Sequence, residues 1–240
     1  MTHSLSQRRL EGELMDDPLL SARAHDRALR GLHRLNAVSR TVATVWRPVA
    51  AIARANPDRT LTLLDVATGG GDLPIGLSQR AQQQGLALTI EGCDISQNVI
   101  NYAHAAAMLA NAPVRFFKAD ALADGLSAHY DIITASLFLH HLTNAQVISL
   151  LRTLAASADH VIVSDLIRNR TGYFLAYAGT RLLSRSPIVR TDGLRSVRAA
   201  FTISEVRELA AQAGLTDAQF MRRWPSRFLM TWHSDEPAAG

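Results

Sequence analysis

Apolar and polar positions along the chain change their spacing at residue 61. From there on, short runs rich in β-branched and aromatic residues occur at 61–67, 87–95, 114–120, 130–137 and 160–166. Segments with helical spacing lie between and after them, at about 73–84, 97–110, 144–156 and 203–213. Strands that alternate with helices are typical of a parallel, doubly wound sheet, so the pattern predicts an α/β fold.

The two ends of the chain have patterns of their own. Residues 5–56 have helical, amphipathic spacing, which predicts either a packing appendage or a cap over an active site. Thr202 and Glu205 have the spacing of a capping box, so a helix should begin there. Two strand-like runs follow Gly214 and predict a terminal hairpin.

Residues 167–201 interrupt the alternation. They combine a short apolar helical run with many arginines and are too long for an ordinary connection in an α/β unit. Insertions of this kind often form lids or binding loops. We therefore predict an N-terminal helical cap at 1–58 and one domain at 59–240, with a lid-like insertion at 167–201.

Composition limits the classes of function. The 240 residues include one cysteine, Cys93, so no disulfide framework forms within the chain. The net charge is +4, but Lys118 is the only lysine and no dense basic run is present, so no nucleic-acid partner is expected. The first residues have no apolar signal segment. We expect a cytoplasmic protein without stable membrane insertion, as a monomer or homodimer.

A glycine-rich loop follows the first predicted strand and places Gly69 and Gly71 beside a ligand. A dinucleotide fingerprint would need a third glycine, where this chain has Pro74. Asp72, a predicted N-cap of the next helix, would also repel a phosphate. Two further acids, Asp94 and Asp120, end the next two strands. They can bind ribose hydroxyls and a purine amine, or simply cap the following turns.

Four successive motifs together resemble a known family. "LLDVATGGGD", "IEGCDIS", "FFKADAL" and "YDIITASLFLHHL" are similar to the motifs of class I S-adenosylmethionine-dependent methyltransferases. The resemblance covers about residues 60–235 and implies a Rossmann-like sheet of seven strands in the order 3-2-1-4-5-7-6, with strand 7 antiparallel. It also implies S-adenosylmethionine as the cofactor and a small-molecule acceptor as the partner.

The family motifs assign roles to particular residues. Asp65, Gly69 and Gly71 would border the methionine part of the cofactor, Asp94 the ribose, and Asp120 with Ala121 the adenine. The full predicted cofactor site consists of Asp65, Ala67, Gly69, Gly71, Asp94, Ile95, Asp120, Ala121 and Ser136.

The motif after the fourth strand bears on the acceptor. It lacks the Asn/Asp-Pro-Pro run of many amine methyltransferases and the acid of metal-dependent catechol methyltransferases, so no metal is expected. Strand and turn periodicity should turn His140 inward, which leaves His141 as the first candidate for a catalytic residue; alternatively, either histidine is satisfied by backbone groups. The insertion offers Tyr173, Tyr177 and Arg181 as candidate acceptor-binding residues.

A looser resemblance connects the N-terminal segment and the insertion to bacterial methyltransferases of polyketide and phenolic pathways. We therefore predict O-methylation of a small phenolic or polyketide-derived acceptor. Three alternatives remain: C-methylation of a quinone-type precursor, a non-catalytic cofactor-binding regulator or partner subunit, and a nicotinamide-dependent reductase.

Overall fold

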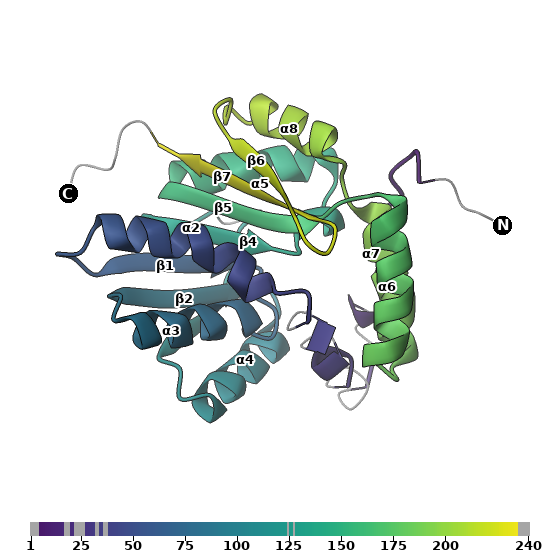
Figure 1. The fold of residues 1–240 in the computed structure, drawn as a ribbon, viewed down its shortest axis with the longest axis horizontal. Coiled ribbons are helices and arrows are strands. Elements are labelled where there is room, and N and C mark those ends of the chain that lie inside the picture. The colour runs from purple at the N-terminus through teal and green to yellow at the C-terminus, as the bar shows by residue number, and fades with distance from the viewer. Residues whose placement is uncertain are drawn as a thin grey trace.

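A seven-stranded sheet forms the centre of the molecule (Figure 1). The computed structural model describes residues 5–16, 20–21, 27–31, 34–35, 38–123, 125–126 and 128–234. The strands are β1 (Leu61–Val66), β2 (Leu88–Asp94), β3 (Val114–Lys118), β4 (Tyr130–Ser136), β5 (Ala158–Leu166), β6 (Gln219–Arg223) and β7 (Arg227–His233).

The strand order is β3-β2-β1-β4-β5-β7-β6. Strands β1 to β5 pair in parallel, and β7 runs antiparallel to both β5 and β6. The predicted α/β class, strand order, antiparallel seventh strand and terminal hairpin are all confirmed.

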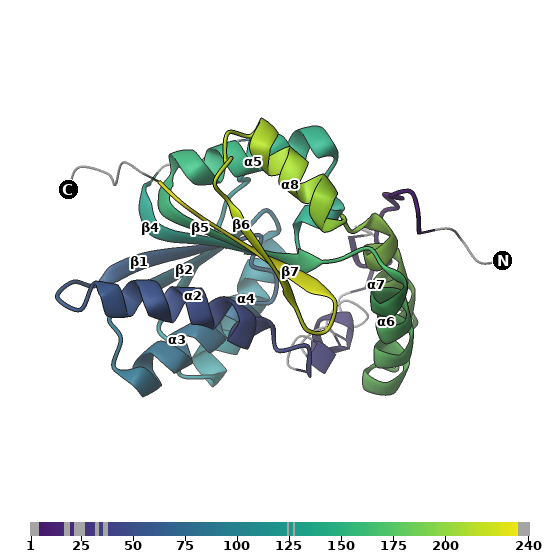
Figure 2. The same cartoon turned by 45° about the horizontal axis from the view of Figure 1, so that its top comes forward.

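Helices cover both faces of the sheet (Figure 2). One face carries α2 (Thr41–Ala55), α3 (Asp72–Gln84) and α4 (Gln97–Leu109), and the other carries α5 (Asn144–Ala156) and α8 (Ile203–Gln212). The predicted capping box at the start of α8 is confirmed: Thr202 accepts from the Glu205 amide while the Glu205 side chain accepts from Thr202.

The residues from 167 to 201 are mostly helical. They form α6 (Arg170–Leu183) and α7 (Pro187–Ala199), which pack against each other and stand beside the carboxyl ends of the strands (Figure 1). The short 3-10 helices η1 (Leu14–Asp16) and η2 (Leu139–His141) contact α7.

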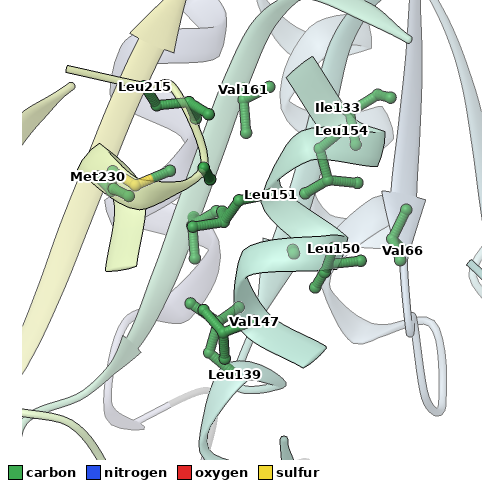
Figure 3. Close-up of a cluster of buried hydrophobic side chains, with 14 of the residues drawn as sticks. Val66, Ile133, Leu139, Val147, Leu150, Leu151, Leu154, Val161, Leu215 and Met230 are labelled. Atoms are coloured by element: carbon green, nitrogen blue, oxygen red, sulfur yellow. The ribbon is translucent and has the colours of Figure 1, made fainter. Parts of the chain in front are cut away.

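Strand β1 shows how the sequence builds a core on each side of the sheet. Leu61 and Leu63 pack with residues of α2 and α3, whereas Leu64 and Val66 pack with residues of α5 and α8. Figure 3 shows part of this second cluster, in which Val66 lies near side chains from β4 and α5. Burial on both faces is expected of a parallel strand and explains why its apolar run is nearly continuous.

Two sequence-based predictions are wrong in detail. Residues 5–13 are not helical. Their polar groups bond to other parts of the chain instead: Arg8 donates to the carbonyls of His140 and Leu142, and the Arg9 amide donates to the Arg198 carbonyl of α7. Asp72 is the first residue of α3 and not its N-cap; that position belongs to Gly71 in a left-handed conformation. Parts of the predicted helical region 5–56 lie outside the described residues.

The division into a cap over 1–58 and a domain over 59–240 stays a prediction. Within the first range, α2 contributes Val45, Trp46 and Val49 to the core under the sheet. Among the described residues, no helix combines the length and apolar character that a membrane crossing requires.

Candidate functional site

The carboxyl ends of the parallel strands open into a cavity of about 1370 Å³. Its walls come from the ends of β1, β2 and β4, from η2 and α6, and from N-terminal residues. Sites for one small molecule usually enclose about 300–1,000 Å³. The cavity can therefore hold two ligands side by side, at the place where open α/β sheets bind them.

Eight of the nine predicted cofactor residues border this cavity. They are Asp65, Ala67, Gly69, Asp94, Ile95, Asp120, Ala121 and Ser136. The ninth, Gly71, faces Phe116, and a Cβ added to it would lie only 2.9 Å from that ring. Their contact with a cofactor stays a prediction, but the fold brings their chain segments together.

The turn after β1 is held in an unusual backbone conformation. Ala67, Gly69 and Gly71 have φ angles of 53°, 55° and 80°. Below the turn, the carboxylate of Asp65 accepts hydrogen bonds from Thr68 Oγ1 at 2.8 Å and Thr134 Oγ1 at 2.7 Å. Asp65 therefore links the glycine turn to β4 through these hydrogen bonds. Burial raises the pKa of Asp65 to about 7.

The two glycines of this turn should respond differently to alanine. A left-handed alanine costs roughly 1–2 kcal/mol. Gly69→Ala should therefore lower the free energy of unfolding by about 1 kcal/mol, because its Cβ meets nothing within 4 Å. Gly71→Ala should cost about 2 kcal/mol or more, because strain and the Phe116 contact add. Denaturant unfolding of both variants measures this, and equal losses would contradict it.

The acids at the ends of β2 and β3 also hold their loops. Asp94 Oδ2 accepts the Gly69 amide and Asp94 Oδ1 the Ser96 amide, both at 3.0 Å. Asp120 Oδ1 accepts the Leu122 amide at 2.9 Å and the Ala123 amide at 3.2 Å. Each carboxylate oxygen has two lone pairs, so these bonds leave acceptor capacity for a ligand.

The end of β4 offers a further polar contact. Ser136 Oγ is buried beside the cavity and has no hydrogen-bond partner among the described residues. The next residue, Leu137, has a φ of 56° and donates its amide to Ser164 O at 2.8 Å. Strained residues thus follow both β1 and β4. The carboxylates, the unpartnered hydroxyl and the glycine turn fit a polyhydroxylated, cationic nucleoside.

His140 and Asp165 form a buried pair. His140 Nδ1 lies 2.7 Å from Asp165 Oδ1, and Asp165 Oδ2 accepts the His140 amide at 3.1 Å. Burial alone would lower the pKa of His140, but the Asp165 carboxylate outweighs it and raises this pKa above its usual value. Because Nδ1 donates to Asp165, the neutral imidazole keeps its Nε2 lone pair for another group.

His141 is the weaker base. Although 31% of its side chain is exposed, burial, and then the neighbouring His140, lower the pKa of His141 to about 3. The predicted inward turn of His140 agrees with its 4% exposure. It does not remove His140 from the site, however, because both histidines border the cavity.

Glu13 joins this end of the cavity from far away in the sequence. Its Oε1 lies 3.8 Å from His140 Nε2 and 4.0 Å from His141 Nε2, and it accepts a hydrogen bond from Ser196 Oγ. The next two amides, of Leu14 and Met15, donate to Asp192 of α7 at 2.9 and 3.0 Å. No local motif marks Glu13, so the sequence alone gives no sign of its role.

Arg8 holds the same N-terminal segment against η2. Its guanidinium donates to the carbonyl of His140 at 2.9 Å and to that of Leu142 at 2.6 Å. It also stacks over Phe201, with 3.8 Å between the guanidinium carbon and the ring centroid. The segment is thus fixed at several points, and its residues Glu13 and Met15 border the cavity.

Among the described residues, Glu13, His140 and His141 form the one group close enough together to ligate a metal. The two imidazole rings are tilted against each other, with centroids 4.2 Å apart and 35° between their planes. His140 Nδ1 is already bonded to Asp165, and Glu13 Oε1 already accepts from Ser196 Oγ, so we interpret the group as a hydrogen-bonded cluster.

Helix α6 presents smaller residues to the cavity than expected. The cavity borders Gly172, Leu175, Ala176 and Thr180 of this helix. Each predicted acceptor-binding residue follows one of these cavity residues by one position. Tyr173 OH accepts a hydrogen bond from Arg198, Tyr177 is 46% exposed, and Arg181 stacks on the Tyr177 ring. With 3.6 residues per turn, that shift places Tyr173, Tyr177 and Arg181 on a neighbouring face, away from the cavity.

Comparisons with known proteins agree with this architecture. A family profile described as "Methyltransferase domain" matches residues 63–159. A ubiquinone biosynthesis O-methyltransferase of Paraburkholderia phytofirmans is 29% identical over 150 residues, covering 61% of this chain and 62% of that protein. Its counterpart in Acinetobacter baylyi is 27% identical over 151 residues, covering 61% of each. The matched region thus spans about three fifths of these relatives.

A solved structure extends the likeness over most of the chain. The magnesium protoporphyrin IX methyltransferase of Synechocystis PCC 6803, with bound S-adenosylhomocysteine, has a TM-score of 0.56 and 19% identity. The alignment covers 91% of this chain and 90% of that one. At this identity, the likeness concerns the fold.

Proposed function

This chain belongs to the class I S-adenosylmethionine-dependent methyltransferases, and we propose that it methylates an oxygen of a small phenolic or polyketide-derived acceptor. The observation that carries the proposal is the buried pair of His140 and Asp165. His140 Nδ1 bonds to Asp165, and His140 Nε2 lies next to Glu13 at the end of the cavity. A phenol is an acidic hydroxyl, and such a hydroxyl needs a base beside it when its oxygen attacks.

The cofactor end of the cavity has a defined set of contacts in this proposal. S-adenosylmethionine supplies a methyl group already activated on a sulfonium. Asp94 accepts hydrogen bonds from the ribose hydroxyls, Asp120 and Ala121 border the adenine, and Asp65 and Gly69 border the methionine part. Among the described residues, the charged side chains that line this half of the cavity are all acidic: Asp65, Asp72, Asp94 and Asp120. This suits a cationic ligand.

At the acceptor end, the chain needs to align one oxygen and remove one proton. The acceptor O–H gives its proton to His140 Nε2, the oxygen forms the new O–CH₃ bond, and the C–S bond breaks to leave the neutral thioether. Asp165 stabilises the imidazolium that forms, as an ionised partner of Nδ1. A base in this position increases the rate about 10²–10⁴-fold, and the remaining rate enhancement comes from alignment of the acceptor oxygen with the methyl group.

The names of two relatives favour oxygen over carbon as the acceptor atom. The relatives from Paraburkholderia and Acinetobacter are named as O-methyltransferases. The His140 base does not decide between the two atoms, because a phenol has to lose its proton before either its oxygen or its ring carbon attacks.

The test is a product analysis. The purified chain is incubated with methyl-labelled S-adenosylmethionine and a panel of phenols that differ in the number and position of their hydroxyls. Mass spectrometry and NMR then locate the label. Label on oxygen supports the proposal. Label on a ring carbon points to C-methylation, and cofactor binding without turnover on any phenol points to a binding protein.

Methyl transfer should not depend on a divalent metal. The absence of an acid at the end of β4 motivates this expectation. Treatment with EDTA followed by desalting should leave turnover unchanged. Loss of activity that Zn²⁺, Mn²⁺ or Mg²⁺ restores would contradict it and would assign Glu13 and the two histidines to a metal site.

A further inference from the structure

Arg227 is a buried cation in the wall of the cavity. It begins β7, is 4% exposed and borders the cavity together with Ser39 and Thr41. Its Nη1 donates to Thr41 Oγ1 at 2.6 Å and its Nη2 donates to Ser39 Oγ at 2.8 Å. Burial lowers the pKa of Arg227 to about 10, so the guanidinium remains protonated at neutral pH.

Among the described residues, no carboxylate is hydrogen-bonded to this cation. Both of its bonded partners are neutral hydroxyls, and its Nε is buried without a hydrogen-bond partner in the described part of the chain. Asp165 raises its pKa from a distance but is already bonded to His140. An isolated buried charge is costly, and folded proteins normally pair it.

Arg168 provides a comparison within the same chain. It is also 4% exposed, yet its guanidinium donates to both carboxylate oxygens of Glu205, at 2.9 and 2.6 Å. Arg168 does not border the cavity, whereas Arg227 does. In the part of the chain that the structure describes, Arg168 away from the cavity thus has a carboxylate partner, and Arg227 beside the cavity has none.

The amino end of α2 lies at the same place. Thr41, which bonds Arg227, is the first residue of this 15-residue helix, and the N-cap residue Arg40 provides no side-chain cap. The amino end of a helix favours negative charge. Two independent features, a guanidinium nitrogen without a partner among the described residues and the amino end of a helix, therefore favour an anion here.

We propose that Arg227, with Ser39, Thr41 and the amino end of α2, forms a carboxylate-binding subsite of the cavity. Glu13, Asp65, Asp94 and Asp120 already line this cavity, so a singly charged carboxylate fits better than a phosphate dianion. The inference rests on the proposed methyl transfer for its ligands. Two ligands bring a carboxylate: the amino-acid end of the cofactor, and an acceptor that is a phenolic acid.

The first experiment compares cofactor ligands by calorimetry and requires no turnover. S-adenosylmethionine and decarboxylated S-adenosylmethionine, which differ only by the carboxylate, are titrated into the wild type and Arg227→Gln. If the cofactor occupies the subsite, the wild type binds the decarboxylated form at least tenfold more weakly. Arg227→Gln should then bring the two affinities to within about threefold of each other.

The second experiment compares acceptors. A phenol and the same phenol bearing a carboxylate are assayed by kcat/KM with the same two proteins. If the acceptor occupies the subsite, the wild type prefers the acid at least tenfold and Arg227→Gln removes that preference. Because the first experiment measures binding alone, it still decides about the cofactor if no phenol is methylated.

Two further variants keep the proposal falsifiable. Arg168→Gln, the matched control, should lower stability and change neither ratio. If Arg227→Gln does not fold, Arg227→Lys serves as the test variant. Its ammonium cannot present the fixed guanidinium N–H groups, so it should reduce the affinity ratio of the cofactor pair or the kcat/KM ratio of the acceptor pair at least threefold. Ratios unchanged for both ligand pairs in the folded Arg227 variants would overturn the proposal and leave Arg227 as an anchor for α2.

Discussion

Replacing His140 with alanine is expected to lower turnover by about 100-fold or more. The variant removes the group that accepts the acceptor's proton, while the cofactor half of the cavity keeps all of its contacts. Binding of S-adenosylhomocysteine, measured by calorimetry, should therefore stay within about threefold of the wild type. The effect should fall on kcat rather than on KM, because the proton moves only in the reaction itself.

His141→Ala is the matched control. This imidazole is adjacent in the sequence and borders the same cavity, but with a pKa of about 3 it is a poor proton acceptor. Its loss should change KM more than kcat, and turnover by less than tenfold. Full activity in His140→Ala together with inactivity in His141→Ala would transfer the role to His141, which sequence periodicity alone favoured.

Removing His140 also leaves Asp165 buried without its partner, which can destabilise the fold. Asp165→Asn tests the pair more gently, because the amide fills the same space. It should lower turnover as well, since Nδ1 loses its ionised partner. Melting temperatures of both variants separate loss of catalysis from loss of structure.

The pH profile gives a readout that structural damage would not reproduce. Turnover requires neutral His140, so it falls as pH decreases through the pKa of this group, which lies above its usual value. Glu13 contributes to raising that pKa. Glu13→Gln should therefore move the acidic limb to lower pH, whereas Glu11→Gln, on the same segment and paired with Arg195, should leave it in place.

The sheet was predictable from sequence because its signals are local. Apolar runs of strand length, the glycine turn after β1 and the capping box at Thr202 each act within a few residues of the chain. The acids at the ends of β2 and β3 then follow from topology, because parallel strands bring their carboxyl ends to one edge. Eight of the nine predicted cofactor residues border the cavity for this reason.

The acceptor end was less predictable because its contacts are long-range. Glu13 reaches the histidines only because Arg8 bonds to η2 and the backbone after Glu13 bonds to Asp192. On α6, an error of one residue in the helical phase separates Thr180, which borders the cavity, from Arg181, which does not. The number of arginines likewise could not distinguish Arg168, which pairs with Glu205, from Arg227, whose hydrogen-bond partners among the described residues are hydroxyls.

Asp94→Asn is expected to weaken binding of S-adenosylhomocysteine at least tenfold. A carboxylate that accepts both ribose hydroxyls forms charge-assisted hydrogen bonds of about 1.5–3 kcal/mol each, and 1.4 kcal/mol corresponds to tenfold. The amide can accept at one atom only. Glu91→Gln is the control, because Glu91 lies on the same strand but pairs with Arg115 and Tyr130 outside the cavity.

Asp94 also holds the Gly69 and Ser96 amides, so weaker binding alone could reflect a loosened loop. A ligand pair separates the two effects. Calorimetry with S-adenosylhomocysteine and its 2′-deoxy analogue gives the contribution of one ribose hydroxyl in each protein. If Asp94 binds the ribose, the wild type discriminates against the deoxy form and Asp94→Asn discriminates much less, since the hydroxyl then has lost its charged partner. Equal discrimination in both proteins would mean that Asp94 acts only by shaping the glycine turn, and that another group binds the ribose.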